Sequence, residues 1–173
     1  MTAGHSFRSP GHSCPDQHDY GAGYPVQDYL FGPPPAKVLY KITNQPFRLA
    51  EKFIVRALES SLDGVAMLVR TSFLEGQSRY ASLFKKQPPT HVLQFAERVI
   101  MHKGKMLDPD VPVRTWSKKL GEWVMRKPST ATSYCWLVWI RNSSGPSRII
   151  WIPPCRKQLT KPGDYLLPEV LAA

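Results

Sequence analysis

The sequence lacks the residue patterns of common enzymes. None of the patterns GxSxG, HExxH, GxxxxGK[ST] and GxGxxG occurs among its 173 residues. They would mark a serine nucleophile, a zinc peptidase, a phosphate-binding loop or a dinucleotide-binding turn. Asp108 and Asp110 flank a proline, and capping of a following helix accounts for both carboxylates. We therefore expect a protein that is not an enzyme and that uses neither a cofactor nor a small-molecule substrate.

Cysteine is scarce as well. Cys14, Cys135 and Cys155 are an odd number at wide spacings, without a CxxC pair, so we expect no disulfide framework and a reducing intracellular compartment. Cytoplasm, nucleus and mitochondrial matrix all meet that condition. His12 and His18 lie near Cys14, but their spacing matches no zinc finger, and we expect no metal site. The apolar runs are too short to span a bilayer.

Acidic residues are absent from a long C-terminal stretch. The net charge of the chain is +10 and its pI is about 9.7, yet residues 1–35 carry −2. No acid lies between Glu122 and Asp164, where aromatic residues alternate with cations. Cations neutralise phosphates and aromatic rings stack on unpaired bases. The stretch therefore predicts an RNA-binding surface made of Arg126, Lys127, Trp136, Arg141, Arg148, Arg156 and Lys157.

The same stretch also favours protein contacts. In a strand across 134–141, Trp136 and Val138 face one side while Leu137 and Trp139 face the other. Both faces are apolar, so the strand must be covered by its own core or by another protein. The alternative function is thus a structural accessory subunit of a large protein complex.

The chain is expected to have three parts. Residues 1–35 are rich in proline and glycine and predict an extended tail, residues 36–153 a single α+β domain, and residues 154–173 a C-terminal loop. Hydrophobic spacing and turn residues predict the elements of the domain. They are strands at 38–42, 65–73 and 79–84, helices at 47–62, 90–103 and 113–124, and a Trp-rich hairpin of strands 134–141 and 147–153.

Residues 38–112 resemble the RNA recognition motif family. The segment 39–44 (LYKITN) resembles its first-strand motif, and 78–84 (SRYASLF) resembles its third-strand motif. The resemblance implies a ferredoxin-like β-α-β-β-α order, with Tyr40 and Tyr80 side by side on an open sheet where they stack bases. Arg79 stands where the motif has glycine, and it joins the predicted RNA-binding residues.

A second resemblance competes over part of this region. Residues 98–110 (RVIMHKGKMLDPD) also resemble the central strand and turn of ubiquitin-like domains. That resemblance makes 98–103 a strand, whereas Thr90 and Gly104 are typical of the caps of a helix. The function expected from the sequence is a component of a ribonucleoprotein assembly, with RNA, protein subunits or both as partners.

Overall fold

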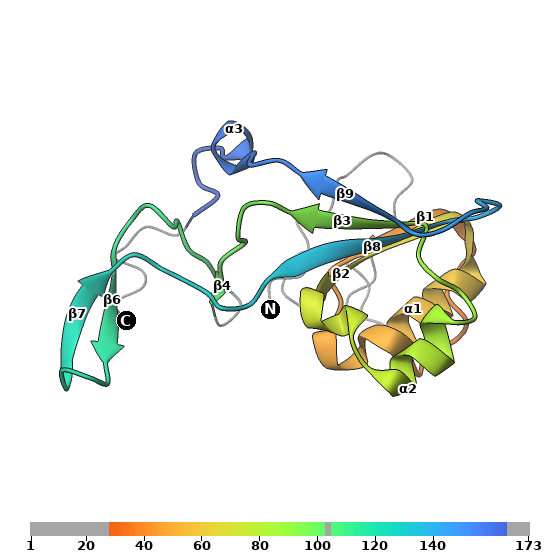
Figure 1. Ribbon diagram of the computed structural model, residues 1–173, viewed down its shortest axis with the longest axis horizontal. Coiled ribbons are helices and arrows are strands. Elements are labelled where there is room, and N and C mark those ends of the chain that lie inside the picture. The colour runs from red at the N-terminus through yellow and green to blue at the C-terminus, as the bar shows by residue number, and fades with distance from the viewer. Residues whose placement is uncertain (1–27, 103–104, 166–173) are drawn as a thin grey trace. The chain divides into compact units, whose positions relative to one another are not determined.

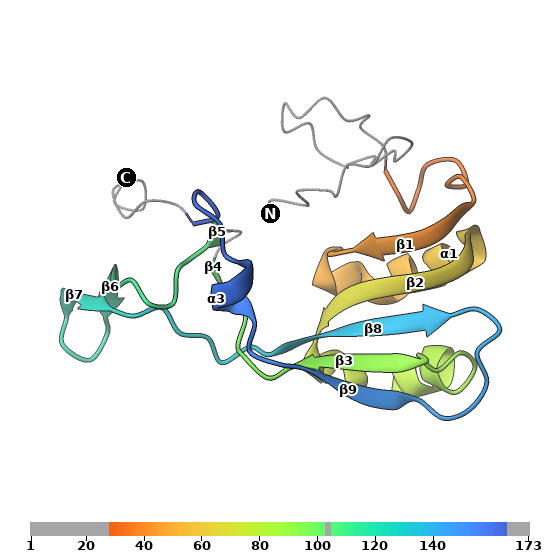
Figure 2. The same ribbon diagram turned by 90° about the horizontal axis from the view of Figure 1, so that it is seen from above.

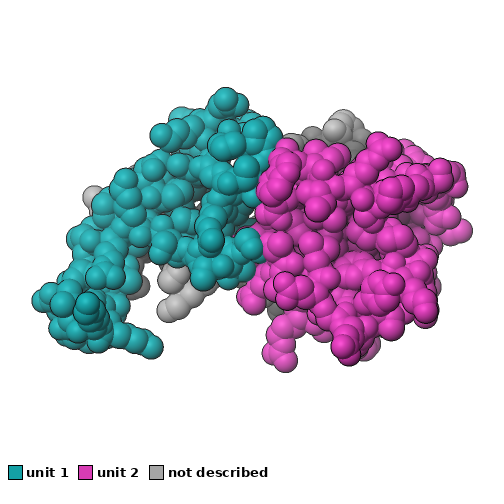
Figure 3. All heavy atoms as spheres, viewed as in Figure 1, with its two compact units in different colours: residues 1–2, 95–133, 152–173 teal, residues 3–94, 134–151 magenta. Residues whose placement is uncertain are grey.

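The computed structural model describes residues 28–102 and 105–165. These residues form two compact units (Figure 3). The sheet unit holds residues 28–94 and 134–151, and the hairpin unit holds the described residues of 95–133 and 152–165. The sequence had predicted one domain across 36–153. Most of the predicted tail lies outside the described residues.

A five-stranded sheet forms the sheet unit (Figure 1). Its strands lie in the order β1-β2-β8-β3-β9. β1 and β2 are parallel, and β8 is antiparallel to both β2 and β3. The bounds of these strands are β1 Val38–Thr43, β2 Ser61–Arg70, β8 Tyr134–Ile140, β3 His91–Phe95 and β9 Arg148–Ile152.

The helix between β1 and β2 forms as its sequence pattern predicts. A short 3-10 helix η1 (Phe47–Leu49) leads into α1 (Ala50–Ser60). Ala50, Ile54 and Ala57 are spaced at four and three residues, so they share one face, and all three are buried. β2 then begins at Ser61. Asp63 and Gly64 therefore lie inside the strand, although their turn chemistry had suggested the end of the helix.

The segment predicted as a strand at 79–84 is helical instead. After β2 come the 3-10 turn η2 (Thr71–Leu74), the short helix α2 (Gln77–Arg79) and the π-helical turn η3 (Tyr80–Phe84). Leu83 is buried, and the ring of Phe84 meets that of Phe73 edge to face at 6.1 Å. Leu83 and Phe84 thus pack against the core from a helical segment, whereas Tyr80 is exposed.

The helix predicted at 90–103 is also wrong. Residues 91–95 form the strand β3, because β8 pairs with them through the register Val92–Leu137 and Leu93–Trp136. Residues 101–102 form the very short strand β4 (Met101–His102), so this part is neither a helix end nor a ubiquitin-like strand across 98–103. Gly104, the predicted cap, lies outside the described residues.

The strands of the predicted Trp-rich hairpin exist, but they do not pair with each other. β3 lies between β8 and β9. Arg148 donates its backbone N–H to Thr90 and Ala96 donates to Ile152, so β9 runs parallel to β3. The α+β class is confirmed. The ferredoxin-like order is not, because the parallel strands β1 and β2 are neighbours and no strand splits them.

One face of this sheet carries the core. Figures 1 and 2 show α1 and α2 on the same face of the sheet. The side chains that pack there include the buried Val65, Met67 and Val69 of β2 and Cys135 and Leu137 of β8. Trp139 joins them, and its Nε1 donates to the backbone oxygen of Gln87 at 2.9 Å. Within the described residues of this unit, no helix lies on the opposite face (Figure 2).

The hairpin unit contains two small antiparallel pairs and a short helix. β4 pairs with β5 (Lys105–Met106), β6 (Val113–Ser117) pairs with β7 (Glu122–Arg126), and α3 spans Arg156–Leu159. The helix predicted at 113–124 is therefore wrong. Gly121 adopts a φ of +68° in the turn between β6 and β7, a conformation that favours glycine. No helix in the described residues is long and apolar enough to cross a bilayer.

Residues 28–33, which the sequence assigned to the tail, pack on α1. The ring of Tyr29 stacks on Phe53 with centroids 4.9 Å apart. Arg56 donates to the backbone oxygens of Gly32 and Pro33 at 2.7 and 2.9 Å. This part of the chain thus contacts its own domain, although the sequence had predicted an extended tail across residues 1–35.

Candidate functional site

The residues of the predicted RNA-binding surface are divided between the two units. Trp136, Arg141 and Arg148 belong to the sheet unit. Arg126, Lys127, Arg156 and Lys157 belong to the hairpin unit. A run that is continuous in sequence therefore supplies parts of two separate structures.

Two predicted arginines already bind the backbone. The guanidinium of Arg141 donates to the carbonyl oxygens of Leu58 and Ser61 at 3.3 and 3.1 Å, beside the C-terminus of α1. Arg79 donates to the carbonyl oxygens of Phe73 and Glu75. Because helix C-termini carry unpaired carbonyls with partial negative charge, Arg141 contributes to the fold at its position.

Arg156 is the centre of an ion-pair cluster in the hairpin unit. Its guanidinium contacts the carboxylates of Glu97, Asp108 and Asp110 at 3.1, 3.6 and 2.7 Å. The hydrogen bond from Arg156 lowers the pKa of Asp110, and the same bond is the main cause that raises the pKa of Arg156. This cluster connects α3 with the loop before β6, and it occupies a cation that the sequence had assigned to RNA.

The predicted pair of stacking tyrosines is not formed. Tyr40 lies on β1, opposite Gly64 and on the sheet face that the helices leave open. Tyr80 lies in the helical segment η3, on the other side of the sheet. Both rings are exposed, but a sheet layer separates them, so they cannot form one platform.

The structure brings a different set of residues together at the carboxyl ends of β1 and β2. A cavity of about 190 Å³ opens there, between η1 and the η2–α2 segment. It is lined by Phe47, Arg48, Ala50, Val69, Arg70, Ser72, Phe73 and Arg79. In open α/β sheets, ligands bind at the carboxyl ends of the parallel strands. The cavity is smaller than the ~300–1,000 Å³ of drug-sized sites, so it fits a single ring or a phosphate.

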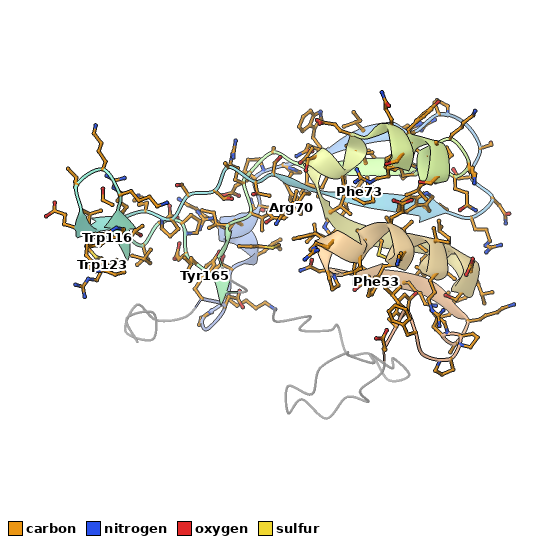
Figure 4. All side chains as sticks on the ribbon, turned by 90° about the horizontal axis from the view of Figure 1, so that it is seen from below. Phe53, Arg70, Phe73, Trp116, Trp123 and Tyr165 are labelled. Atoms are coloured by element: carbon orange, nitrogen blue, oxygen red, sulfur yellow. The ribbon has the colours of Figure 1, made fainter. Side chains whose placement is uncertain are left out.

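Two arginine–aromatic stacks flank this cavity. The guanidinium carbon of Arg70 lies 5.2 Å from the centroid of Phe47, and that of Arg79 lies 4.1 Å from the centroid of Phe73. Both distances are within the range of cation–π attraction. Arg70 and Phe73 are labelled in Figure 4. Among the described residues, no ion pair joins Arg48 or Arg70 to a carboxylate.

The loop between β1 and η1 is anchored by Gln45. This side chain is buried, and its Nε2 donates to the backbone oxygen of Leu68 at 3.0 Å. Its Oε1 has no partner among the described residues. The bond holds Asn44 and Phe47, which flank Gln45 and Pro46, beside the end of β2. Asn44 is exposed there.

Only Arg79 of this set had been predicted from the sequence as a site residue. Phe47 is the first residue of the helix predicted at 47–62, and in the structure it is half-buried and lines the cavity. One signal was present in the sequence. A strand followed at once by Asn44-Gln45-Pro46-Phe47 marks the carboxyl end of a β-α unit, and such ends are where ligands bind.

Metal binding has no support from the described residues. They contain no group of three or more histidine, cysteine, aspartate or glutamate side chains that could hold an ion. His12, Cys14 and His18, considered in the sequence, lie outside the described residues. Comparison of the chain with family models, with curated proteins and with solved structures found no match.

Proposed function

We propose that this chain binds single-stranded nucleic acid, with one nucleotide held at the carboxyl ends of β1 and β2. The observation that carries the proposal is the pair of arginine–aromatic stacks, Arg70 on Phe47 and Arg79 on Phe73, around one cavity. Aromatic and guanidinium faces stack on unpaired bases, and arginine forks bind phosphate oxygens.

Charge supports the same partner. The cavity is lined by three arginines and by no acidic residue. Each phosphate contact releases counterions, so a basic site of this kind gains much of its affinity from the nucleic acid backbone. The exposed amide of Asn44 adds a group that can donate to and accept from a base edge.

The test is fluorescence anisotropy of short labelled oligonucleotides with the full chain. Single-stranded RNA and DNA of mixed sequence should both bind. Duplexes should bind more weakly, because their bases are paired and stacked on one another and are not available to the protein. The double variant Arg48→Gln/Arg70→Gln should bind less tightly. Removing two phosphate contacts should reduce the slope of log K against log salt by about 1.4, since each contact contributes about 0.7 on single strands.

A matched control separates the cavity from overall charge. Lys85→Gln/Lys86→Gln also removes two positive charges, but neither lysine lines the cavity. This control should keep most of the affinity. Equal losses in both double variants would show that the cavity has no special role, and no binding by the unchanged protein at low salt would reject the proposal.

A second function, that of a subunit in a protein assembly, has its own supporting observation. β1 is an edge strand of the sheet, and it exposes Tyr40 and Ile42 by 58% and 70% on the face that no described helix covers. Exposed edges often carry a lysine that prevents pairing with other chains. Here the amino group of Lys41 is not free to protect the edge, because its Nζ donates to the backbone oxygens of Ala36 and Ser60.

The edge of β1 therefore suits a partner strand that continues the sheet. Tyr40→Lys/Ile42→Lys would place charges on both exposed apolar positions. If the assembly hypothesis holds, this variant should lose the proteins that co-purify with the unchanged chain. Identical sets of co-purified proteins would reject the β1 edge as the interface.

A further inference from the structure

The β6–β7 hairpin presents an aromatic face where the sequence had predicted a helix at 113–124. Trp116 and Trp123 are directly opposite each other in the register of the two strands. Their rings meet edge to face, with centroids 5.6 Å apart. Figure 4 labels both side chains on this hairpin. Their exposed fractions are 49% and 55%, so about half of each indole remains open to a ligand.

Two further residues extend this face. Arg114 and Met125 are opposite each other two residues along the strands from the tryptophan pair, so they point to the same side as the tryptophans. The guanidinium of Arg114 lies 5.2 Å from the ring centroid of Trp123. Met125 is also exposed. The result is a row of flat or flexible apolar surfaces with a cation stacked among them.

The charge of the hairpin fits an anionic partner. Residues 113–127 contain five cations and one acid. The cations are Arg114, Lys118, Lys119, Arg126 and Lys127, all of them exposed. Lys118 and Lys119 lie in the turn that joins the strands, where Ser117 holds the backbone by accepting from Gly121 at 2.8 Å.

We propose that the β6–β7 hairpin is a nucleic-acid contact, in which an unpaired base stacks on Trp116 or Trp123 while the turn lysines bind the adjacent phosphates. This inference rests on the proposed function for its class of partner, but not on the cavity of the sheet unit. Stacking on an aromatic side chain tolerates any base, so the hairpin should add affinity without sequence preference.

The same tryptophan pair also stabilises the hairpin. Cross-strand aromatic pairs contribute roughly 0.2–1 kcal/mol, and isolated two-stranded hairpins are marginally stable in water. A test must therefore separate lost stacking from lost folding. Trp116→Phe/Trp123→Phe keeps two rings in place, whereas Trp116→Ala/Trp123→Ala removes both.

The experiment uses the full chain and a short single-stranded oligonucleotide that contains 2-aminopurine, whose fluorescence is quenched when it stacks. The unchanged protein should quench the probe on binding. The double alanine variant should quench less and raise the Kd by about 5- to 150-fold, while the double phenylalanine variant should keep most of the affinity. Trp151→Ala, which removes an exposed tryptophan from β9, should change neither quantity.

Charge provides a second variant that leaves the aromatic pair intact. Lys118→Gln/Lys119→Gln should retain the quenching but reduce the salt slope of binding by about 1.4. An unchanged slope would overturn the assignment of phosphates to the turn. If the alanine variant fails to fold, this charge variant still decides the question.

The outcomes also separate this inference from the proposed function. No binding by the unchanged protein overturns both. Weak binding by Arg48→Gln/Arg70→Gln together with normal binding by Trp116→Ala/Trp123→Ala overturns the hairpin inference alone, and the exposed face would then belong to a protein partner. The reverse pattern overturns the cavity and supports the hairpin.

Discussion

The indole nitrogen of Trp139 donates to the carbonyl oxygen of Gln87 at 2.9 Å and so links the central strand β8 to the end of the helical segment η3. Trp139→Phe removes this bond and part of the buried ring volume. We expect it to lower the free energy of unfolding by about 1–3 kcal/mol. Trp151→Phe, at an exposed tryptophan, should change it by less than about 0.5 kcal/mol. Urea unfolding of both variants measures the difference, and equal effects would contradict the link.

Ile54 of α1 is completely buried, whereas its neighbour Val55 on the same helix is exposed. Ile54→Ala should cost about 2–5 kcal/mol, the range for large-to-small changes in a core. Val55→Ala on the same helix is the matched control and should cost under about 0.5 kcal/mol. A loss below about 1 kcal/mol for Ile54→Ala would mean that α1 does not pack on the sheet as described.

The Arg156 cluster should make the hairpin unit sensitive to acid. The hydrogen bond from Arg156 lowers the pKa of Asp110 below its ordinary value of 3.8. The bond therefore contributes stability that is complete above pH 3.8 and is lost as the pH falls through the lowered pKa. NMR titration of the Asp110 carboxyl should give a lower pKa in the unchanged chain than in Arg156→Gln. The same midpoint in both proteins would contradict the contact.

The two described cysteines should differ in reactivity. Burial raises the pKa of the Cys135 thiol to about 11, so almost no thiolate exists there near neutral pH. Cys155 is only half-buried. In a Cys14→Ser background, an aromatic disulfide reagent at pH 8 should modify one thiol quickly and the second only after denaturant is added. Fast modification of both thiols would show that β8 is not shielded.

The spacing of hydrophobic residues along the sequence was sufficient to predict some helices and strands. The apolar residues of α1 repeat at helical spacing over three turns, and no alternative strand pattern fits them. β2 contains the run Val65–Val69, which is too short for a helix of its own and is bounded by polar residues. The strands β1 and β8 were found for similar reasons.

Short segments with two possible periods were misread. In and beside β3, Val92, Phe95 and Ala96 fit a helical stripe, but only the pairing with the neighbouring β8 shows that residues 91–95 are a strand. In the β6–β7 hairpin, Trp116, Leu120 and Trp123 also fit helical spacing. Gly121, with its positive φ, was the signal of a turn. The prediction that β8 pairs with β9 was wrong, because turn residues show where a chain reverses and do not show which strand lies beside it.

The sequence by itself determined the α+β class, the basic charge, the helix α1 and the strands β1, β2 and β8. These depend on hydrophobic spacing between residues near one another in the chain. The tertiary structure alone decided that β3 lies between β8 and β9, that Arg156 binds three carboxylates, and that Arg70 and Phe47 meet at one cavity. Each of these depends on residues far apart in sequence, whose contacts form only when the strands pair and the helices close over the sheet.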